Sequence, residues 1–119
     1  MAYSFSESNG VEVLRVDNLL NPLDNQEIIK AVEEKIQASS TTFVVDLIDM
    51  DFMNSSGLTF LISILTRSRS AGGEVAIANL SENIKKILLI TRLNSAFSIY
   101  GSVEEALKAL QPEQPLLED

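Results

Sequence analysis

The alternation of apolar and polar positions predicts two antiparallel strands at the start of the chain. Aromatic and polar residues alternate from Tyr3 to Ser8, and valines recur in a second extended run over residues 11–16. Asn9 and Gly10 separate the two runs, and this pair is a strong signal for a tight turn because both positions tolerate a positive φ. We therefore expect the sheet to open with a β-hairpin.

Short apolar runs and helical patterns alternate over the rest of the chain. Strands are expected over residues 42–48, 74–78 and 97–100, where β-branched and apolar residues gather. Helices are expected after a cap at Asp24 or Asn25, over residues 57–70, after a cap at Ser81, and from a capping box at Ser102 and Glu105 to Leu110. The order ββαβαβαβα predicts an α/β fold with a mixed, mostly parallel sheet and right-handed crossovers.

Apolar residues on two of these helices separate the expected core from the expected surface. The core stripe of the second helix holds Leu58, Leu61, Ile62 and Leu65. Leu89 and Ile90 lie outside the main stripe of the third helix. Burial is the more common outcome for such large apolar residues, and an exposed contact patch is the alternative.

Composition narrows the functional classes. The chain of 119 residues has no cysteine and no histidine, which removes disulfides, the usual zinc sites and a Ser-His-Asp hydrolase. Its net charge of −8 disfavours nucleic acid and anionic membrane as partners. Neither a signal peptide nor an apolar run of spanning length is visible, so by elimination we expect a cytoplasmic protein.

The length of the chain allows one hydrophobic core. We expect residues 1–110 to form the folded domain. The tail over residues 111–119 carries two prolines and three acids, and we expect it to be disordered.

The loop over residues 49–57 holds the candidate site. It leaves the carboxyl end of a buried strand and enters a helix, and ligands of open α/β sheets usually bind at that edge. Ser55, Ser56 and Gly57 lie together at the helix start, whose unpaired amides favour an anion such as phosphate. Asn54, Ser55 and Ser56 are also common N-cap residues, and Gly57 allows close packing, so a purely structural role is the alternative.

This loop and the helix after it carry a resemblance to a known family. The run DLIDMDFMNSSGLTFLISI, over residues 46–64, resembles the strand–loop–helix signature of STAS domains (sulfate transporter and anti-sigma-factor antagonist). More narrowly, it is similar to the stand-alone bacterial anti-sigma-factor antagonists, or anti-anti-sigma factors. The resemblance extends to the opening hairpin, the element order, the Gly72-Gly73 pair and the segment AIANLSENIKKI over residues 76–87.

The resemblance implies a partner-switching regulator that is not an enzyme. In this family a serine kinase that also binds a sigma factor phosphorylates the first serine of the Ser-Ser-Gly motif, which is Ser55 here. The unphosphorylated antagonist captures the kinase and frees the sigma factor, and a PP2C-type phosphatase resets the phosphorylated form. The resemblance places the phosphosite loop and the partner contact at Asn21, Asn54, Ser56, Gly57 and Thr59. It implies no cofactor, no metal, and a monomer or weak dimer.

Two asparagines depart from the family pattern. Aspartate usually precedes the phosphorylated serine, where this chain has Asn54, and a second acidic position aligns by eye with Asn21. The amides remove carboxylates that could orient the serine hydroxyl, and they lessen the repulsion of a phosphate. The alternative to a switch is therefore a STAS module that is never phosphorylated and acts as a constitutive partner or scaffold.

Two further alternatives rest on fewer residues. Asp46, Asp49 and Asp51 are carboxylates of the kind that bind magnesium, although Asp46 lies inside a strand and the other two are expected to be solvated. A small hydrolase or nucleotide-binding enzyme that uses Ser55 would lack both a histidine or lysine base and a phosphate-cradling glycine-rich loop.

Overall fold

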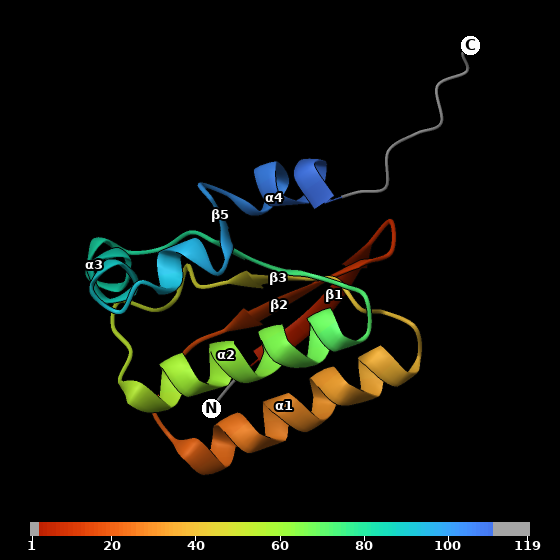
Figure 1. The fold of residues 1–119 in the computed structure, drawn as a ribbon, viewed down its shortest axis with the longest axis horizontal. Helices are drawn as coiled ribbons and strands as arrows, with labels where there is room; N and C mark the ends of the chain where they lie inside the picture. The colour runs from red at the N-terminus through yellow and green to blue at the C-terminus, as the bar shows by residue number, and fades with distance from the viewer. Residues whose placement is uncertain (1–2, 111–119) are drawn as a thin grey trace.

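The computed structural model describes residues 3–110, which form one five-stranded sheet with helices on both faces (Figure 1). The strands are β1 (Tyr3–Ser8), β2 (Val11–Val16), β3 (Phe43–Asp46), β4 (Val75–Ala78) and β5 (Ser98–Tyr100). The helices are α1 (Pro22–Gln37), α2 (Ser55–Ser70), α3 (Glu82–Ile90) and α4 (Val103–Leu110), with a short 3₁₀ turn, η1 (Leu93–Ser95), before β5. The predicted order of strands and helices is confirmed. The expectation for the tail lies outside the described residues.

The sheet is mixed and mostly parallel, as predicted. Its strand order is β1-β2-β3-β4-β5, in which β1 runs antiparallel to β2 and the other neighbours are parallel. Asn9 and Gly10 form the tight turn of the hairpin with φ values of 52° and 87°, the left-handed conformation that this pair favours.

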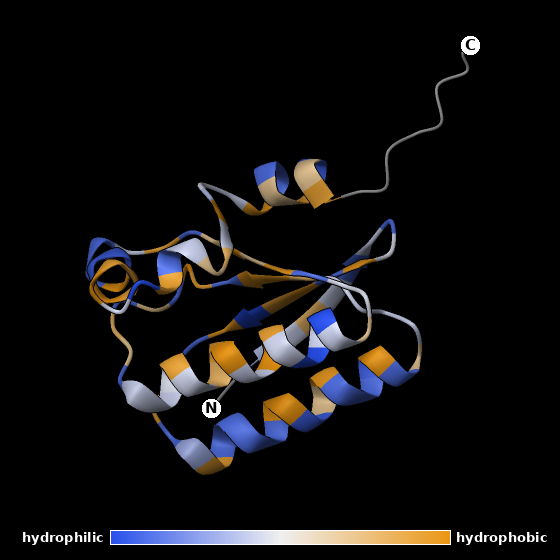
Figure 2. Ribbon diagram, in the orientation of Figure 1, coloured by the Kyte–Doolittle hydropathy of each residue, from blue (hydrophilic) through white to orange (hydrophobic). Residues whose placement is uncertain are grey.

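Two hydrophobic layers hold the helices to the sheet. Helices α1 and α2 lie side by side on one face, and α4 covers the opposite face (Figure 1). The larger core lies on the α1 and α2 side, where apolar residues of the helices turn toward the sheet (Figure 2). The smaller core beneath α4 is built from Val11, Val44, Ala76, Ala78 and Ala106. The central strands β3 and β4 are buried on both faces, which explains their nearly continuous apolar sequences.

Helix α1 begins earlier than predicted. Its N-cap is Asn21, whose Oδ1 accepts hydrogen bonds from the backbone amides of Leu23 at 2.8 Å and Asp24 at 3.2 Å. The expected cap at Asp24 or Asn25 is wrong because Pro22 opens the helix. Proline suits the first helical position, where its missing N–H would have no helical partner.

Helix α2 also begins earlier, at Ser55, with Asn54 as the N-cap. Its buried face holds Phe60, Leu61, Ile64 and Leu65. Ile62, expected on the core stripe, is exposed, because the stripe advances by three and four residues and passes on either side of that position.

The end of α3 is another correction. Leu89 and Ile90 are exposed to 63% and 80%, so the expectation that they pack inside is wrong; a role for them in partner contact stays a prediction. At α4, Ser102 Oγ accepts from the Glu105 amide at 3.1 Å, as the capping box predicts. The Glu105 carboxylate, however, accepts from the amide of Gly101 at 3.1 Å, one residue before the expected partner.

Candidate functional site

The Ser-Ser-Gly motif forms the first turn of α2, directly after the loop that leaves β3. Ser55 and Ser56 are the first two helical residues; Ser55 is exposed, Ser56 is half-buried and Gly57 is buried. Within residues 3–110, neither serine hydroxyl makes a hydrogen bond to the rest of the protein. The Ser55 hydroxyl therefore faces solvent at the positive end of the helix dipole.

Asn54 connects this turn to the neighbouring loop. Its Oδ1 accepts from the Gly57 amide at 3.2 Å, and its Nδ2 donates to the backbone carbonyl of Leu20, also at 3.2 Å. Leu20 directly precedes Asn21, the N-cap of α1. The two departures from the family pattern are thus the N-caps of two adjacent helices, joined through one hydrogen bond.

Asn25 makes a second connection between the same elements. It is 4% exposed, and its Nδ2 donates to the carbonyl oxygens of Leu19 at 2.9 Å and Ser56 at 3.3 Å. Sequence reasoning considered Asn25 only as a cap and missed this role. The signal was its spacing, because Asn25 stands three, four and seven residues before Ile28, Ile29 and Val32 and so lies on the buried stripe of α1.

Gly57 is a position of close packing. A Cβ at this residue would lie 2.9 Å from the Cβ of Met53 and 3.4 Å from the Cβ of Leu19. The packing interpretation of this glycine is therefore supported by the geometry. The absence of a side chain lets the first turn of α2 lie against the loop that leads to α1.

Thr59 is exposed one turn further along α2, four residues after Ser55 and therefore on the same face. The structure thus brings Asn54, Ser55, Ser56, Gly57 and Thr59 together, with Asn21 at the start of the neighbouring helix. A small pocket between α1 and α2 opens beside them and is lined in part by Ser55, Ser56 and Thr59.

Exposed apolar side chains flank this polar surface. Leu20, Leu23 and Phe52 are all exposed, and they lie in the two loops and the first helical turn that surround the N-caps. Single exposed apolar residues are ordinary, but several beside one polar loop are typical of a protein-binding surface.

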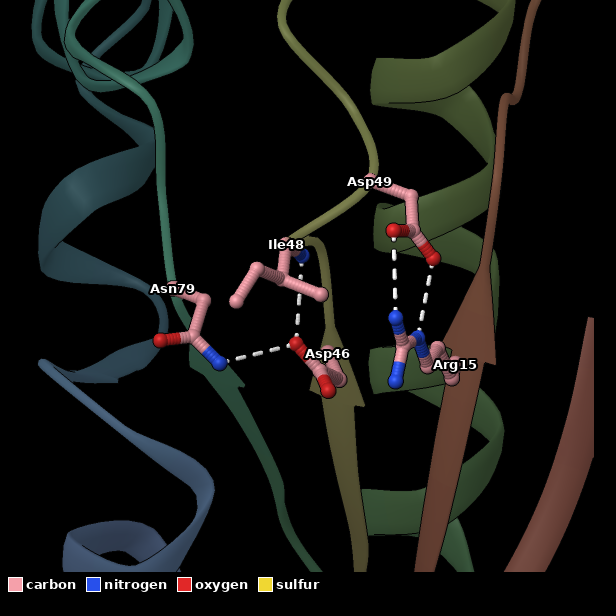
Figure 3. Close-up of polar contacts among 5 residues, drawn as sticks. All are labelled: Arg15, Asp46, Ile48, Asp49 and Asn79. Atoms are coloured by element: carbon pink, nitrogen blue, oxygen red, sulfur yellow. Dashed lines mark hydrogen bonds and ion pairs between the residues drawn. The ribbon is translucent and has the colours of Figure 1, made fainter.

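The three aspartates considered as a magnesium site turn to different partners, and Figure 3 shows two of them, Asp46 and Asp49. Asp46 Oδ1 accepts from the Asn79 side chain at 2.9 Å and from the Ile48 amide at 3.1 Å, while Asp51 accepts from the Asn83 side chain at 3.1 Å. Among residues 3–110, no cluster of three or more potential metal ligands is found. The structure thus gives the magnesium alternative no support.

Asp49 pairs with Arg15 of β2 through two hydrogen bonds, from Nε at 2.8 Å and from Nη2 at 3.1 Å (Figure 3). The hydrogen bond from Arg15 lowers the pKa of the Asp49 carboxyl, and the same bond raises the pKa of the guanidinium. The pair joins the end of the hairpin to the loop after β3 and lies outside the serine turn.

The helices of the described segment, residues 3–110, are all too short or too polar to span a bilayer.

Comparison with known proteins identifies the fold and a family. A model of the STAS domain matches residues 3–106. A Thermotoga neapolitana protein named as a candidate anti-sigma factor antagonist is 27% identical over 103 residues, which cover 85% of this chain and 90% of the relative.

Solved structures agree. The crystal structure of a candidate anti-sigma factor antagonist from Thermotoga maritima has a TM-score of 0.84 and 22% identity, and the match covers 92% of this chain and 95% of that one. The anti-sigma factor antagonist SpoIIAA in its unphosphorylated form has a TM-score of 0.77 at 16% identity, with 95% and 100% covered. Bacillus SpoIIAA in its phosphorylated form has a TM-score of 0.72 at 19% identity, with 91% and 98% covered.

Proposed function

The chain belongs to the STAS domain family, and from this premise we propose that it is an anti-sigma factor antagonist switched by phosphorylation of Ser55. Unphosphorylated, it binds a serine-kinase anti-sigma factor through the surface around the first turn of α2. Phosphorylated, it releases that partner until a PP2C-type phosphatase removes the phosphate. The observation that carries the proposal is the exposed hydroxyl of Ser55, which makes no hydrogen bond within residues 3–110, at a helix start beside exposed apolar residues.

The electrostatics of the helix start favour a phosphate at this position. A phosphoserine adds about −1.5 to −2 charges, which the amides and the dipole at a helix N-terminus stabilise. The fold is therefore expected to survive modification. SpoIIAA, whose fold this chain shares, has been solved in both a phosphorylated and an unphosphorylated form, which supports a switch without refolding.

The same phosphate would oppose binding. Leu20, Leu23 and Phe52 offer apolar contact area beside Ser55, and a partner that covers them must also desolvate the serine. A phosphoserine dianion buried under the partner would lose its hydration, which carries a large free-energy cost. A loss of about 3 kcal/mol corresponds to more than 100-fold weaker binding.

The first experiment is a phosphorylation assay with the purified protein, ATP, Mg²⁺ and the serine kinase encoded nearest to it. We expect mass spectrometry to place one phosphate on Ser55. The Ser55→Ala variant should take up none, and the Ser56→Ala variant should still be modified at Ser55. Phosphate on Ser56 alone would move the switch to the half-buried neighbour and contradict the assignment.

A binding assay tests the consequence. By calorimetry, Ser55→Ala should bind the kinase as the unmodified protein does, whereas Ser55→Glu should bind about 100-fold more weakly, in line with that estimate. Thr66→Glu places the same charge on an exposed position of α2, about three turns after Ser55, and should bind normally. Equal affinities for Ser55→Ala and Ser55→Glu would exclude a charge-driven switch.

The second candidate function is a STAS module that binds its partner constitutively. Two asparagines favour it. Asn21 and Asn54 both serve as N-caps, and neither position supplies a carboxylate beside Ser55. Absence of phosphate on Ser55, with the kinase active on another antagonist, would favour this function. Asn21→Asp and Asn54→Asp then test the cause, since restoring the family's acids should restore modification.

A further inference from the structure

Strand β1 is an open edge of the sheet. It stands first in the order β1-β2-β3-β4-β5, so within residues 3–110 it pairs with β2 alone, and its burial pattern is mostly exposed. It has six residues, whereas β5 at the opposite edge has three. An edge strand presents a row of backbone N–H and C=O groups with which another strand can pair. The longer edge of this sheet is therefore a template for a further strand.

A backbone hydrogen bond of β2 shows which groups of β1 point outward. The Glu12 amide donates to the Thr42 carbonyl, next to β3, at 3.0 Å, so it points away from β1. Glu12 lies opposite Glu7, and the two therefore form a non-bonded pair of the antiparallel ladder. Because bonded and non-bonded pairs alternate along such a ladder, Tyr3, Phe5 and Glu7 turn their backbone N–H and C=O groups away from β2. Within residues 3–110, these outward groups make no hydrogen bond.

The features that usually protect an edge strand are missing from β1. The strand contains no lysine and no proline, and its pairing with β2 runs without a bulge. Its one charged residue is Glu7, at the turn end of the strand, whose carboxylate accepts from the Gly10 amide at 3.2 Å. The edge is thus open to a strand of another chain.

A second copy of the chain matches the outward groups in one register. Antiparallel pairing about a two-fold axis at Phe5 sets Phe5 opposite Phe5 and Tyr3 opposite Glu7, so every outward-facing residue of β1 meets another. These pairs exchange about six main-chain hydrogen bonds, whereas an axis at Ser4 or Ser6 leaves about four within β1. The same register pairs the aromatic rings of Phe5 and the hydroxyls of Ser4 with Ser6, which are favourable cross-strand contacts, and it sets no like charges opposite each other.

We propose that two copies of this chain associate through their β1 strands, in the register centred on Phe5, and form one continuous sheet. Opposite residues share a face, so α1 and α2 of both copies lie on the same side of that sheet. Main-chain pairing over one short strand is a small contact, typical of a weak and transient association. Each copy has a net charge of −8, so mutual repulsion opposes the dimer and salt strengthens it. The inference does not depend on the proposed function, because Ser55 lies outside β1.

Introduced cysteines test the register directly, because the chain has none of its own. In the proposed dimer, Ser4 of one copy and Ser6 of the other form a non-bonded pair with Cα atoms about 4.5 Å apart, within the range of about 4.4–6.8 Å that a disulfide spans. Ser4→Cys and Ser6→Cys proteins, one of them enlarged by a tag, are mixed at submillimolar concentration in high salt and oxidised in a glutathione buffer. By non-reducing electrophoresis, we expect the mixed disulfide to dominate over both homodimers. Ser70→Cys, an exposed serine at the end of α2, is the matched control and should not cross-link with Ser4→Cys above background.

Two variants of Glu7 test the role of the outward amides. Glu7→Pro removes an N–H that points away from β2, a position where an edge strand accepts proline, and Glu7→Ala removes the same carboxylate while keeping the amide. By analytical ultracentrifugation, we expect the dissociation constant of the dimer to be at least about tenfold higher for Glu7→Pro than for Glu7→Ala, because one hydrogen bond is lost from each copy. Circular dichroism shows whether both variants fold, and the cysteine experiment does not depend on either of them.

Three results would each overturn the proposal. The first is an unmodified chain that stays monomeric at submillimolar concentration in high salt. The second is a mixed disulfide of Ser4→Cys with Ser6→Cys that forms no more readily than the homodimers or the Ser70→Cys control. The third is an equal dissociation constant for folded Glu7→Pro and Glu7→Ala, which would place the dimer contact away from the edge of β1.

Discussion

The side-chain amide of Asn54 donates to the carbonyl oxygen of Leu20 at 3.2 Å, across 34 positions of the sequence. The same side chain caps α2 by accepting from the Gly57 amide at 3.2 Å. One asparagine thus fixes the start of α2 and holds it to the loop that leads into α1. An aspartate can perform the first task and not the second, because a carboxylate at neutral pH has no hydrogen to donate.

The two asparagines should therefore respond differently to aspartate. Asn54→Asp loses a hydrogen bond worth about 0.5–1.5 kcal/mol and sets a carboxylate against a carbonyl oxygen, which offsets the gain of about 0.3–1 kcal/mol from a negative charge at a helix start. Asn21 uses only its Oδ1 within the described segment, so Asn21→Asp keeps its contacts and gains the charge interaction. In urea denaturation, we expect Asn21→Asp to be the more stable by about 1 kcal/mol.

Salt provides the internal control for this pair. The gain in stability of Asn21→Asp over the unmodified protein should shrink as ionic strength rises, because salt screens a charge at an exposed helix start. The deficit of Asn54→Asp should persist in part, since a missing donor is not restored by salt. Equal free energies of unfolding for the two variants would mean that the Leu20 contact contributes nothing.

Gly57 should not tolerate alanine. Substitution normally stabilises a helix by about 1 kcal/mol, yet a Cβ here would lie 2.9 Å from the Cβ of Met53, which is held by its own backbone. Overpacking of this kind costs about 1–3 kcal/mol, so we expect Gly57→Ala to lower the free energy of unfolding by about 1 kcal/mol net. Thr66→Ala, at an exposed position on the same helix, should be neutral or stabilising by chemical denaturation. A more stable Gly57→Ala would show that the loop moves freely.

A buried glutamate of β2, Glu12, forms an ion pair with a half-exposed lysine of α1, Lys35. Glu12 is 5% exposed, its Oε1 lies 3.7 Å from the Lys35 ammonium nitrogen, and this oxygen makes no hydrogen bond within residues 3–110. Lys35→Met leaves the carboxylate buried without its counter-charge. We expect a loss of about 1–3 kcal/mol, less than for a fully buried pair because the lysine is half-exposed.

Two further variants separate charge from packing at this pair. Lys30→Met removes an exposed lysine from the same helix and should change stability by less than about 0.5 kcal/mol. The double variant Glu12→Leu with Lys35→Met should recover most of the loss, since apolar residues can replace a buried pair. A double variant as unstable as Lys35→Met alone would assign the loss to the contact of the Lys35 ammonium with the Phe5 ring, whose centroid lies 5.1 Å from Nζ.

Much of the fold could be predicted from the sequence because its signals are local. The Asn9-Gly10 turn, the apolar strands and the helical stripes each act over a few residues, and their alternation leaves few topologies. The start of α1 was placed three or four residues late, and that of α2 two residues late. At α1, Asn21 as the N-cap and Pro22 as the first helical residue define the first turn, whereas the prediction placed the cap at Asp24 or Asn25.

The position of the candidate site could also be predicted from a local motif, whereas the contacts that build the site could not. The Ser-Ser-Gly motif lies where predicted, at the start of α2. The contacts of Asn25 with Ser56 and of Asn54 with Leu20 join residues 31 and 34 positions apart, and they depend on how α1 packs beside α2. The exposure of Leu89 and Ile90 agrees with their position outside the main stripe of α3, and the expectation of burial came from the general tendency of large apolar residues to be buried.

The Arg15–Asp49 pair should make the loop after β3 sensitive to acid. The hydrogen bond from Arg15 lowers the pKa of Asp49 in the folded chain below its unfolded value. The contribution of this pair to stability is therefore fully present above the unfolded pKa, and it is lost as the pH falls through the lower folded pKa.

Carboxyl NMR titration should show the midpoint of Asp49 rising toward its ordinary value in Arg15→Met. Lys85→Met removes a surface lysine that pairs with Glu82 and should leave that midpoint unchanged. An Asp49 midpoint that stays low in Arg15→Met would show that another group, and not the guanidinium, holds the carboxylate.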